Sequence, residues 1–125
     1  MVLFFYPLNF TFVCPTELVQ FSDRIKEFRD INCEVVGCSV DSRFSHMTYT
    51  KLERKKGGLG KMNIPLLSDV SKKIATAYDC LCDVGADDGV AFRATYIIDK
   101  NQILRYMSVC DMPVGRNVDE ILRIV

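Results

Sequence analysis

One stretch near the start of the chain, FFYPLNFTFVCPTE at residues 4–17, restricts the possible fold more than any other. It overlaps the apolar run of residues 2–6, which is typical of a buried strand. Pro7 ends this strand, because proline offers no N–H to a strand ladder and restricts the residue before it. A helix is predicted to start close to Pro15 and to run to about Asp30, because apolar residues recur there at helical spacing. These residues are Leu18, Phe21, Ile25 and Phe28.

This order places Cys14 at or beside the N-terminus of the predicted helix. Proline is favoured at the first helical position, and Glu17 in the first turn suits the helix dipole. A thiol at this position faces unpaired backbone N–H groups and the positive end of the dipole. Such surroundings lower the pKa of a cysteine from about 8.5 to roughly 3.5–7.5, so that thiolate is present at neutral pH. Strand, proline, turn, cysteine and helix together form the layout of a thiol-redox site.

The composition indicates an ordinary globular domain. The chain has 125 residues, of which 49% are hydrophobic and 26% charged, and its formal net charge is zero. We expect one domain, residues 1–125, and no nucleic-acid partner, because there is no basic patch. No apolar run approaches the roughly 20 residues of a membrane span, so no membrane association is expected. The N-terminus lacks a positively charged region and a small-residue cleavage site, which predicts a cytoplasmic location.

Strand and helix patterns alternate in the middle of the chain. Residues 34–40 form a near-continuous apolar run, which is typical of a parallel strand covered on both faces. A helix is expected from a cap at Asp41 or Ser42 to about Lys55. Its apolar side is predicted to consist of Phe44, Met47 and Leu52.

The remaining elements complete an α/β pattern. In order we expect a glycine-rich loop at 55–61, a strand at 64–67, a helix capped by Ser68 or Asp69, loops over 79–89, an antiparallel hairpin of 95–99 and 103–109, and a last helix. Asn117 followed by Glu120 resembles a capping box at the start of that helix. The order predicts a mixed central β-sheet flanked by helices.

Six cysteines do not indicate a disulfide framework, because the chain is neither short nor rich in loops. Cys38 falls within a predicted core strand and is expected to act as a small buried hydrophobe. The spacing of Cys80, Cys82 and Cys110 includes no C-x-x-C pair, so no zinc site is expected. These three residues and Cys33 are predicted to be free thiols without an assigned role.

A family resemblance emerges from the same residues. Pro7-x-x-x-Thr11-x-x-Cys14 matches the active-site motif of the peroxiredoxins, and the surrounding residues resemble the typical 2-Cys subgroup of that AhpC/TSA family. The resemblance covers nearly the whole chain and implies a thioredoxin-like fold. It continues through GCSVDS at 37–42, GGLG at 57–60, FR at 92–93, IID at 97–99 and DMPVGR at 111–116.

The resemblance implies a thiol-dependent peroxidase without metal, haem, flavin or other cofactor. Cys14 would be the peroxidatic nucleophile, oxidised to sulfenic acid by hydrogen peroxide or organic hydroperoxides. The Thr11 hydroxyl would both donate to sulfur or peroxide and accept from the peroxide O–H, and Pro7 would shield the thiol from water. Arg93 would pair with the thiolate and the peroxide oxygens, because its charge is permanent and its donors form a rigid fork. Glu17 and Arg116 would orient Arg93 or the peroxide.

The resemblance also implies partners. These are a peroxide substrate, a thioredoxin-like dithiol reductant and a second copy of the chain in a homodimer, with decamers of such dimers as an extension. Family members carry strands before the first one predicted here and a tail with a resolving cysteine in a Val-Cys-Pro segment. No such segment occurs in this sequence, so no resolving cysteine is assigned. The usual partner of the GGLG loop, a C-terminal Tyr-Phe helix, is not found either.

Other functions are compatible with parts of the same sequence. A redox-switched chaperone or a peroxide-signal relay could use the same cysteine as a switch, and a redox-inert domain would leave its pKa ordinary. A thioredoxin-type reductase needs a second cysteine where Glu17 stands.

His46 is the only histidine and is expected to be structural or interfacial. The GGLGK segment lacks the spacing of a phosphate loop. Asn9, where many family members have aspartate, is expected to be a turn residue.

Overall fold

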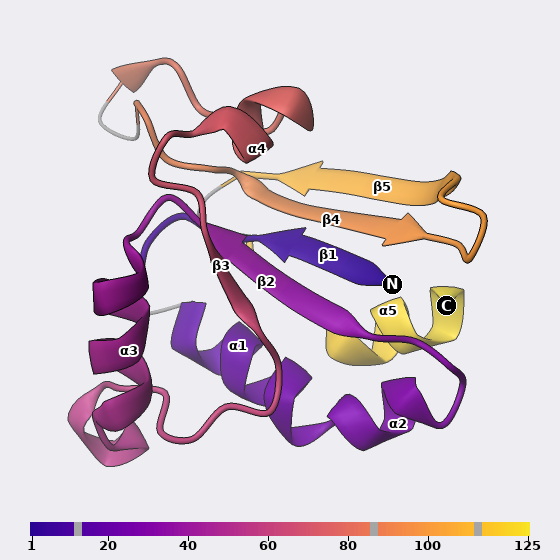
Figure 1. Ribbon diagram of the computed structural model, residues 1–125, viewed down its shortest axis with the longest axis horizontal. Helices are drawn as coiled ribbons and strands as arrows, with labels where there is room; N and C mark the ends of the chain where they lie inside the picture. The colour runs from indigo at the N-terminus through magenta and orange to yellow at the C-terminus, as the bar shows by residue number, and fades with distance from the viewer. Residues whose placement is uncertain (12–13, 86–87, 112–113) are drawn as a thin grey trace.

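The computed structural model describes residues 1–11, 14–85, 88–111 and 114–125, without the side chains of Cys14 and Pro15. One five-stranded sheet in the order β3-β2-β1-β4-β5 forms its centre (Figure 1). β1 is parallel to β2, and β2 to β3, whereas β4 is antiparallel to both β1 and β5. The predicted mixed sheet is therefore confirmed. Its strands are β1 (Val2–Phe5), β2 (Val35–Ser39), β3 (Leu66–Ser68), β4 (Arg93–Ile98) and β5 (Leu104–Cys110).

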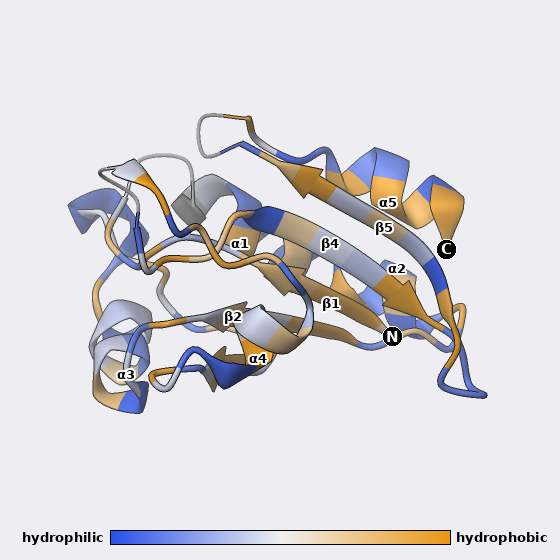
Figure 2. Ribbon diagram, turned by 90° about the horizontal axis from the view of Figure 1, so that it is seen from above, coloured by the Kyte–Doolittle hydropathy of each residue, from blue (hydrophilic) through white to orange (hydrophobic). Residues whose placement is uncertain are grey.

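Helices cover both faces of this sheet. The helices α1, α2 and α5 lie on one face and α4 on the other, as the two views in Figures 1 and 2 show. None of the helices in the described ranges is long and apolar enough to cross a membrane. The helices are α1 (Cys14–Asp23), α2 (Ile25–Arg29), α3 (Arg43–Lys51), the 3₁₀ turn η1 (Arg54–Lys56), α4 (Lys73–Ala77) and α5 (Val118–Ile124).

The central strand β1 is apolar throughout its length (Figure 2). Side chains alternate between the two faces of a strand. Val2, Phe4 and Tyr6 therefore enter the core between the sheet and α1, α2 and α5. Leu3 and Phe5 enter the second core, on the α4 side. Arg93 lies on the α1 side of β4, because the residues that alternate with it, Ala94 and Tyr96, belong to the second core.

Aromatic stacking fixes α1 on the sheet. The ring of Phe4 stacks on that of Phe21 in α1, with centroids 4.5 Å apart and an interplanar angle of 15°. The predicted helix start near Pro15 is confirmed. The single helix to Asp30 is instead two helices, because α1 ends at Asp23 and Arg24 departs from helical geometry with ψ near 14°. Phe28 in α2 still reaches the same core.

The predicted apolar side of α3 is wrong. Phe44 is 64% exposed and Met47 is 52% exposed, whereas His46 and Tyr49 are the buried residues of this helix. His46 is tolerated inside because both of its ring nitrogens find hydrogen-bond partners. The Ser42 cap is confirmed, since its hydroxyl accepts the N–H of Ser45 at 3.1 Å. The helix ends at Lys51, short of the predicted Lys55.

Polar side chains accept backbone N–H groups at the starts of α4 and α5. The buried Asp69 carboxylate accepts the N–H groups of Ile74 and Ala75 at 3.0 and 2.8 Å, although α4 itself begins only at Lys73. Asn117 caps α5 by accepting the N–H of Asp119 at 2.9 Å. Glu120 does not complete the expected capping box, because its carboxylate pairs with Arg123 on the same helix.

The hairpin of β4 and β5 and the early strands match the prediction closely. Arg93 opens β4 opposite Cys110, the last residue of β5. The short third strand begins at Leu66, two residues later than predicted.

Replacing Phe4 by alanine is expected to lower the free energy of unfolding by about 3–5 kcal/mol, because it removes a fully buried ring that stacks on Phe21. The matched change at exposed Phe44 should cost less than about 1 kcal/mol. Urea unfolding followed by circular dichroism measures both variants. Equal losses in the two variants would contradict the placement of Phe4 at the centre of the core.

Candidate active site

The first helix brings Cys14 and Glu17 to one end of the sheet. Cys14 is the first residue of α1, and Glu17 follows three residues later. Residues at this spacing lie on the same side of a helix. The side chain of Cys14 lies outside the described part, as do Phe12 and Val13, so the predicted lowering of its pKa stays a prediction.

The Glu17 carboxylate joins two arginines from distant parts of the chain. Its Oε1 accepts Nη1 of Arg93 at 2.6 Å and Nη2 of Arg116 at 3.0 Å. Its Oε2 accepts Nε and the backbone N–H of Arg116, both at 2.7 Å. All three side chains are only 4% exposed. The three predicted site residues are thus brought together in one buried cluster, named here the Arg–Glu–Arg cluster.

The side chain of Arg116 is fixed by a carboxylate, a carbonyl oxygen and an aromatic ring. Its Nη1 donates to the carbonyl oxygen of Ala94 at 2.8 Å, and its Cζ lies 5.0 Å from the centre of the Phe4 ring. A guanidinium over an aromatic face is attracted by the ring's electrons. The side-chain and backbone bonds to Glu17 together anchor the segment between β5 and α5 to the start of α1. Strand, helix and loop therefore meet at one carboxylate.

The Arg–Glu–Arg cluster carries an excess of positive charge. Burial raises the pKa of Glu17, but hydrogen bonds and charge from Arg116 and the charge of Arg93 outweigh it, so that the pKa of Glu17 is lowered overall. Glu17 is therefore ionised at neutral pH. The two guanidinium groups and the one carboxylate of the cluster have a formal net charge of +1. A buried positive charge of this kind stabilises a nearby thiolate or oxyanion.

Pro7 and Thr11 lie between β1 and α1. Pro7 is buried and follows directly after the first strand and Tyr6. Thr11 is half-buried, and its hydroxyl donates to the carbonyl oxygen of Leu8 at 3.3 Å. That bond uses the hydroxyl proton and leaves the oxygen as an acceptor. Their predicted roles toward sulfur and peroxide stay predictions.

Asn9 is the residue whose importance the sequence did not reveal. It lies in a turn, as expected, but it is only 6% exposed. Its Oδ1 accepts the hydroxyl of Tyr6 at 2.8 Å, and its backbone N–H donates to Asp41 at 2.9 Å. Its Nδ2 lies 3.0 Å from both Ser45 Oγ and His46 Nδ1. Asn9 therefore connects the loop before Cys14 to α3. No motif or residue spacing in the sequence predicts this structural role.

His46 acts as a tie between three elements. Its Nδ1 faces the Asn9 amide, a donor, so that the proton lies on Nε2, which donates to the Leu67 carbonyl at 3.0 Å. This arrangement supports the structural role that was expected for it.

The glycine-rich loop packs against the far end of α1. Leu59 is fully buried, and its carbonyl oxygen accepts Nε of Arg54 at 2.9 Å. The same guanidinium pairs with Asp23, the last residue of α1, at 2.9 Å. A Cβ added to Gly58 would lie 2.2 Å from the carbonyl oxygen of Leu52, so only glycine fits there.

The other five cysteines are free thiols, as predicted. Burial raises the pKa of Cys38 to about 12 and that of Cys80 to about 11. Both therefore remain protonated at neutral pH, and thiolate chemistry at these positions is suppressed. Among the described residues no group of three or more His, Cys, Asp or Glu side chains is placed to hold a metal ion.

The mixed sheet, its strand order and a cysteine that opens the helix after the central strand define a protein of the thioredoxin-like fold class. Residues 1–107 match the family model described as the AhpC/TSA family. The chain belongs to this family.

Relatives and solved structures agree with this assignment. A thioredoxin peroxidase of Trypanosoma brucei rhodesiense is 62% identical over the whole chain, which spans 61% of that relative. A mitochondrial thioredoxin-dependent peroxide reductase of Drosophila melanogaster is 60% identical over the whole chain, which spans 52% of it. The crystal structure of the reduced Plasmodium vivax 2-Cys peroxiredoxin superposes with a TM-score of 0.93 at 44% identity, over 98% of this chain and 62% of that one. The chain therefore spans about half to three fifths of the relatives' length.

Replacing Glu17 by glutamine should lower the free energy of unfolding by about 3–5 kcal/mol at neutral pH, because two buried guanidinium groups lose their counter-ion. A carboxylate with a lowered folded pKa contributes stability above its unfolded pKa, near 4.5, and loses it as pH falls through the folded value. The gap between wild type and Glu17→Gln should therefore close on acidification. Urea unfolding at a series of pH values measures it.

Glu27→Gln is the matched control, because Glu27 is exposed and pairs with Arg24 on the surface. It should change stability little at any pH. A loss in this control as large as that of Glu17→Gln would show that the cluster is not a special source of stability.

Proposed function

We propose that this chain carries the peroxide-reducing site of a thiol-dependent peroxidase with Cys14 as its nucleophile. The observation that carries the proposal is the buried Arg–Glu–Arg cluster, whose carboxylate stands three residues after Cys14 on α1. A peroxidase needs a thiolate and fixed positive charge where the O–O bond breaks. The names of the relatives, thioredoxin peroxidase and thioredoxin-dependent peroxide reductase, support the same activity.

In the proposed reaction the Cys14 thiolate attacks the terminal oxygen of hydrogen peroxide or an organic hydroperoxide. A sulfur–oxygen bond forms and the O–O bond breaks. The leaving oxygen departs as hydroxide or alkoxide and takes a proton to become water or an alcohol. Sulfur is oxidised to sulfenic acid, and the peroxide is reduced.

Each neighbour has a proposed part in this step. Arg93 stabilises the thiolate and the negative charge on the leaving oxygen, while Glu17 and Arg116 hold its guanidinium in position. The Thr11 oxygen accepts a hydrogen bond from the peroxide O–H, whose proton passes to the leaving oxygen, and Pro7 keeps water from the sulfur. The charge of Arg93 is delivered without reorganisation because its partners are already in place.

Recycling needs a dithiol. Sulfenic acid condenses with a thiol, releasing water and forming a disulfide. A thioredoxin-like reductant then restores the thiols by exchange. We propose this partner because the relatives' names include thioredoxin.

The cytoplasmic location stays a prediction, and one of these relatives is named mitochondrial.

A second copy of the chain is the proposed structural partner. β5 is an edge strand, and its register shift near Ile98 places Leu104, Met107 and Val109 on one face. These side chains are 45%, 53% and 44% exposed. An edge strand with an apolar face is a template for pairing with another chain. Assembly of such dimers into decamers is a further prediction from the family resemblance.

Stopped-flow mixing of the reduced protein with hydrogen peroxide tests the chemistry. The wild-type protein should react with hydrogen peroxide much faster than an ordinary free thiol. Mass spectrometry should identify the product as sulfenic acid at Cys14. Cys14→Ser should react no faster than an ordinary free thiol, because the remaining described cysteines include the strongly protonated Cys38 and Cys80. Cys110→Ser removes a partly buried thiol that lies opposite Arg93 but has no part in the proposed step, so it should keep the wild-type rate. Equal slow rates in all three proteins would refute the proposal.

Met107→Glu should convert the dimer to monomers, because it places a carboxylate in the apolar face of β5. Sedimentation velocity over a range of protein concentrations measures the change. Val70→Glu, at a position that is 58% exposed and follows β3 at the opposite edge of the sheet, is the control and should leave the dimer intact. A monomeric wild type, or a dimer unaffected by Met107→Glu, would exclude this face as the interface.

A further inference from the structure

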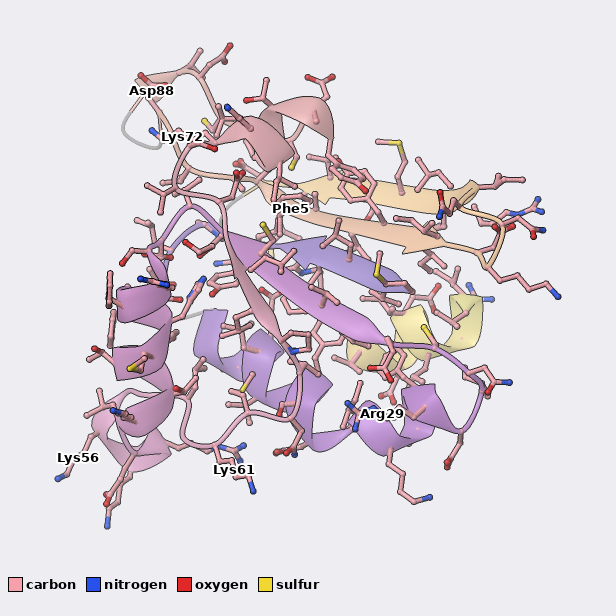
Figure 3. All side chains as sticks on the ribbon, in the orientation of Figure 1. Phe5, Arg29, Lys56, Lys61, Lys72 and Asp88 are labelled. Carbon is pink, nitrogen blue, oxygen red and sulfur yellow. The ribbon has the colours of Figure 1, made fainter. Side chains whose placement is uncertain are left out.

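The backbone has an unusual conformation at Phe10, in the segment that joins β1 to α1. This segment leaves β1 after Phe5, which is labelled in Figure 3, and passes beside the start of α3 in Figure 1. Asn9 and Phe10 occupy the middle of a turn, and φ of Phe10 is 63°, in the left-handed region. A turn with positive φ at its third residue normally has glycine or asparagine there. For a bulky side chain this conformation is an outlier.

Phe10 differs from the other residues that share this geometry. Asparagine and aspartate adopt positive φ most readily, because their short polar side chains form local hydrogen bonds. Phe10 is the only aromatic residue in the set, and half of its surface is exposed, so burial of the ring offsets only part of the cost. The described residues other than glycine with positive φ are Phe10, Asn32, Lys72, Asp79 and Gln102.

The contact that compensates for this backbone conformation is a ring pair with α3. The ring centroid of Phe10 lies 4.5 Å from that of Tyr49, with an interplanar angle of 44°. Aromatic rings at this separation attract each other beyond the effect of the apolar area that they bury. Tyr49 is fully buried, and its carbonyl oxygen accepts the N–H of Leu59 at 2.9 Å, so the partner ring is itself held in place.

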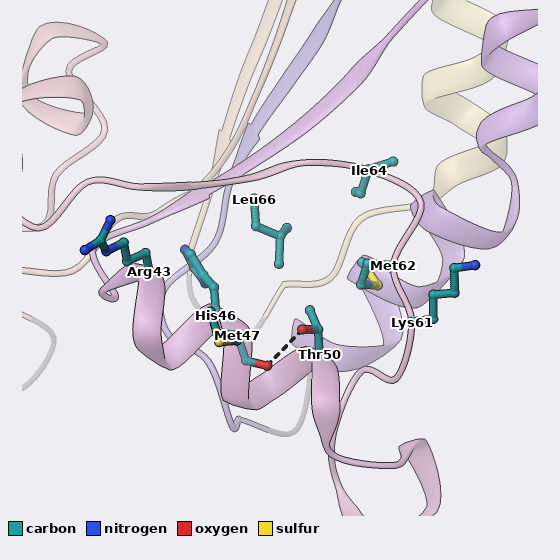
Figure 4. A pocket seen from close by; sticks show the side chains of 8 residues that line it. All are labelled: Arg43, His46, Met47, Thr50, Lys61, Met62, Ile64 and Leu66. Carbon is teal, nitrogen blue, oxygen red and sulfur yellow. Dashed lines mark hydrogen bonds between the residues drawn. The ribbon is translucent and has the colours of Figure 1, made fainter.

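Asn9 anchors the preceding residue to the same helix. Its Nδ2 lies 3.0 Å from both Ser45 Oγ and His46 Nδ1. Figure 4 shows His46 directed from α3 toward the strands, on the wall of a hollow of about 540 Å³ whose lining includes none of residues 7–11. Tyr49 follows His46 by about one helical turn. Two consecutive loop residues therefore contact two consecutive turns of α3.

Thr11 follows Phe10 directly, and its hydroxyl donates to the carbonyl oxygen of Leu8 at 3.3 Å, across the same turn. A change of Phe10 to negative φ would redirect the chain and move Thr11 away from this position. We infer that Phe10 is a positioning residue, whose ring pair with Tyr49 holds the left-handed turn that places the Thr11 hydroxyl for the peroxide. This inference rests on the proposed function and assigns Phe10 no contact with the peroxide.

Stopped-flow kinetics of single and double variants tests the inference. Phe10→Ala should lower the rate constant for hydrogen peroxide about tenfold, because alanine keeps the cost of positive φ but loses the ring pair. Phe10→Tyr retains the ring and should react like wild type. In a Thr11→Val background the hydroxyl is already absent, so Phe10→Ala should lower the rate less than about twofold further. Ile31→Ala, at a position that is 49% exposed and follows α2, is the matched control and should keep the wild-type rate.

Two further measurements separate positioning of Thr11 from general damage. Alkylation of Cys14 by iodoacetamide involves no peroxide O–H, so its rate should be the same in Phe10→Ala and wild type. The amide of Asn9 donates to Asp41 at 2.9 Å, and in Phe10→Ala it should exchange with deuterium about tenfold faster, whereas the amides of α3 stay protected. Hydrogen exchange followed by mass spectrometry measures this release of the loop without any peroxide.

Three results would overturn the inference. These are unchanged exchange at Asn9 in Phe10→Ala, a wild-type peroxide rate in Phe10→Ala, or an equal tenfold loss when Thr11 is already valine. Each of them leaves the peroxidase itself intact if wild type still reacts rapidly at Cys14. A slow reaction of wild type would instead refute the proposed function. The inference and the proposed function can therefore fail separately.

Discussion

The arrangement of this molecule depends on one buried carboxylate. Glu17 accepts hydrogen bonds from two arginines and one backbone N–H, and each partner comes from a different part of the chain than α1. Burying charge costs several kcal/mol per ion unless the ions are paired and hydrogen-bonded. Here the carboxylate is paired with both guanidinium groups. The same interaction therefore ties α1 to β4 and to the segment before α5, and the proposed thiolate chemistry would depend on it.

The sheet explains how so polar a cluster is tolerated. Its two faces are packed by different cores, and β1 supplies alternate residues to both. The α1 face is rich in large aromatic rings such as Phe4 and Phe21, which stack and keep water away. Phe4 lies between Phe21 and the Arg116 guanidinium. The apolar core and the charged cluster therefore share a side chain, and neither can be repacked without moving the other.

Sequence patterns predicted the parts of this structure that arise from local periodicity and from a strong motif. Alternation along β1, the run of β2 and the hairpin turn have signals within a few residues, and Pro15 marks the start of α1. The residues of the cluster followed from family resemblance. Their contact spans 76 and 99 residues of sequence, a separation that no local pattern encodes.

The failures have a common physical cause. The sequence favoured Phe44 and Met47 as the buried side of α3, because hydrophobic residues are the usual signal for burial. The structure buries His46 instead, since Asn9 and the Leu67 carbonyl satisfy its ring. Asn9 was missed for the same reason. A buried polar network is stable only when all its members are in place, so a single residue read alone shows nothing of it.

The separation of Arg116 from Glu17 along the chain affects the order in which the protein folds. Its bonds to Glu17 close a loop of 99 residues, and such distant contacts form late because the loop entropy must first be overcome. During synthesis, α1 leaves the ribosome well before Arg116 exists. A nascent chain can thus display the cysteine-bearing helix while its charge cluster is still incomplete. The thiol reactivity proposed for this cluster would arise only in chains that have finished folding.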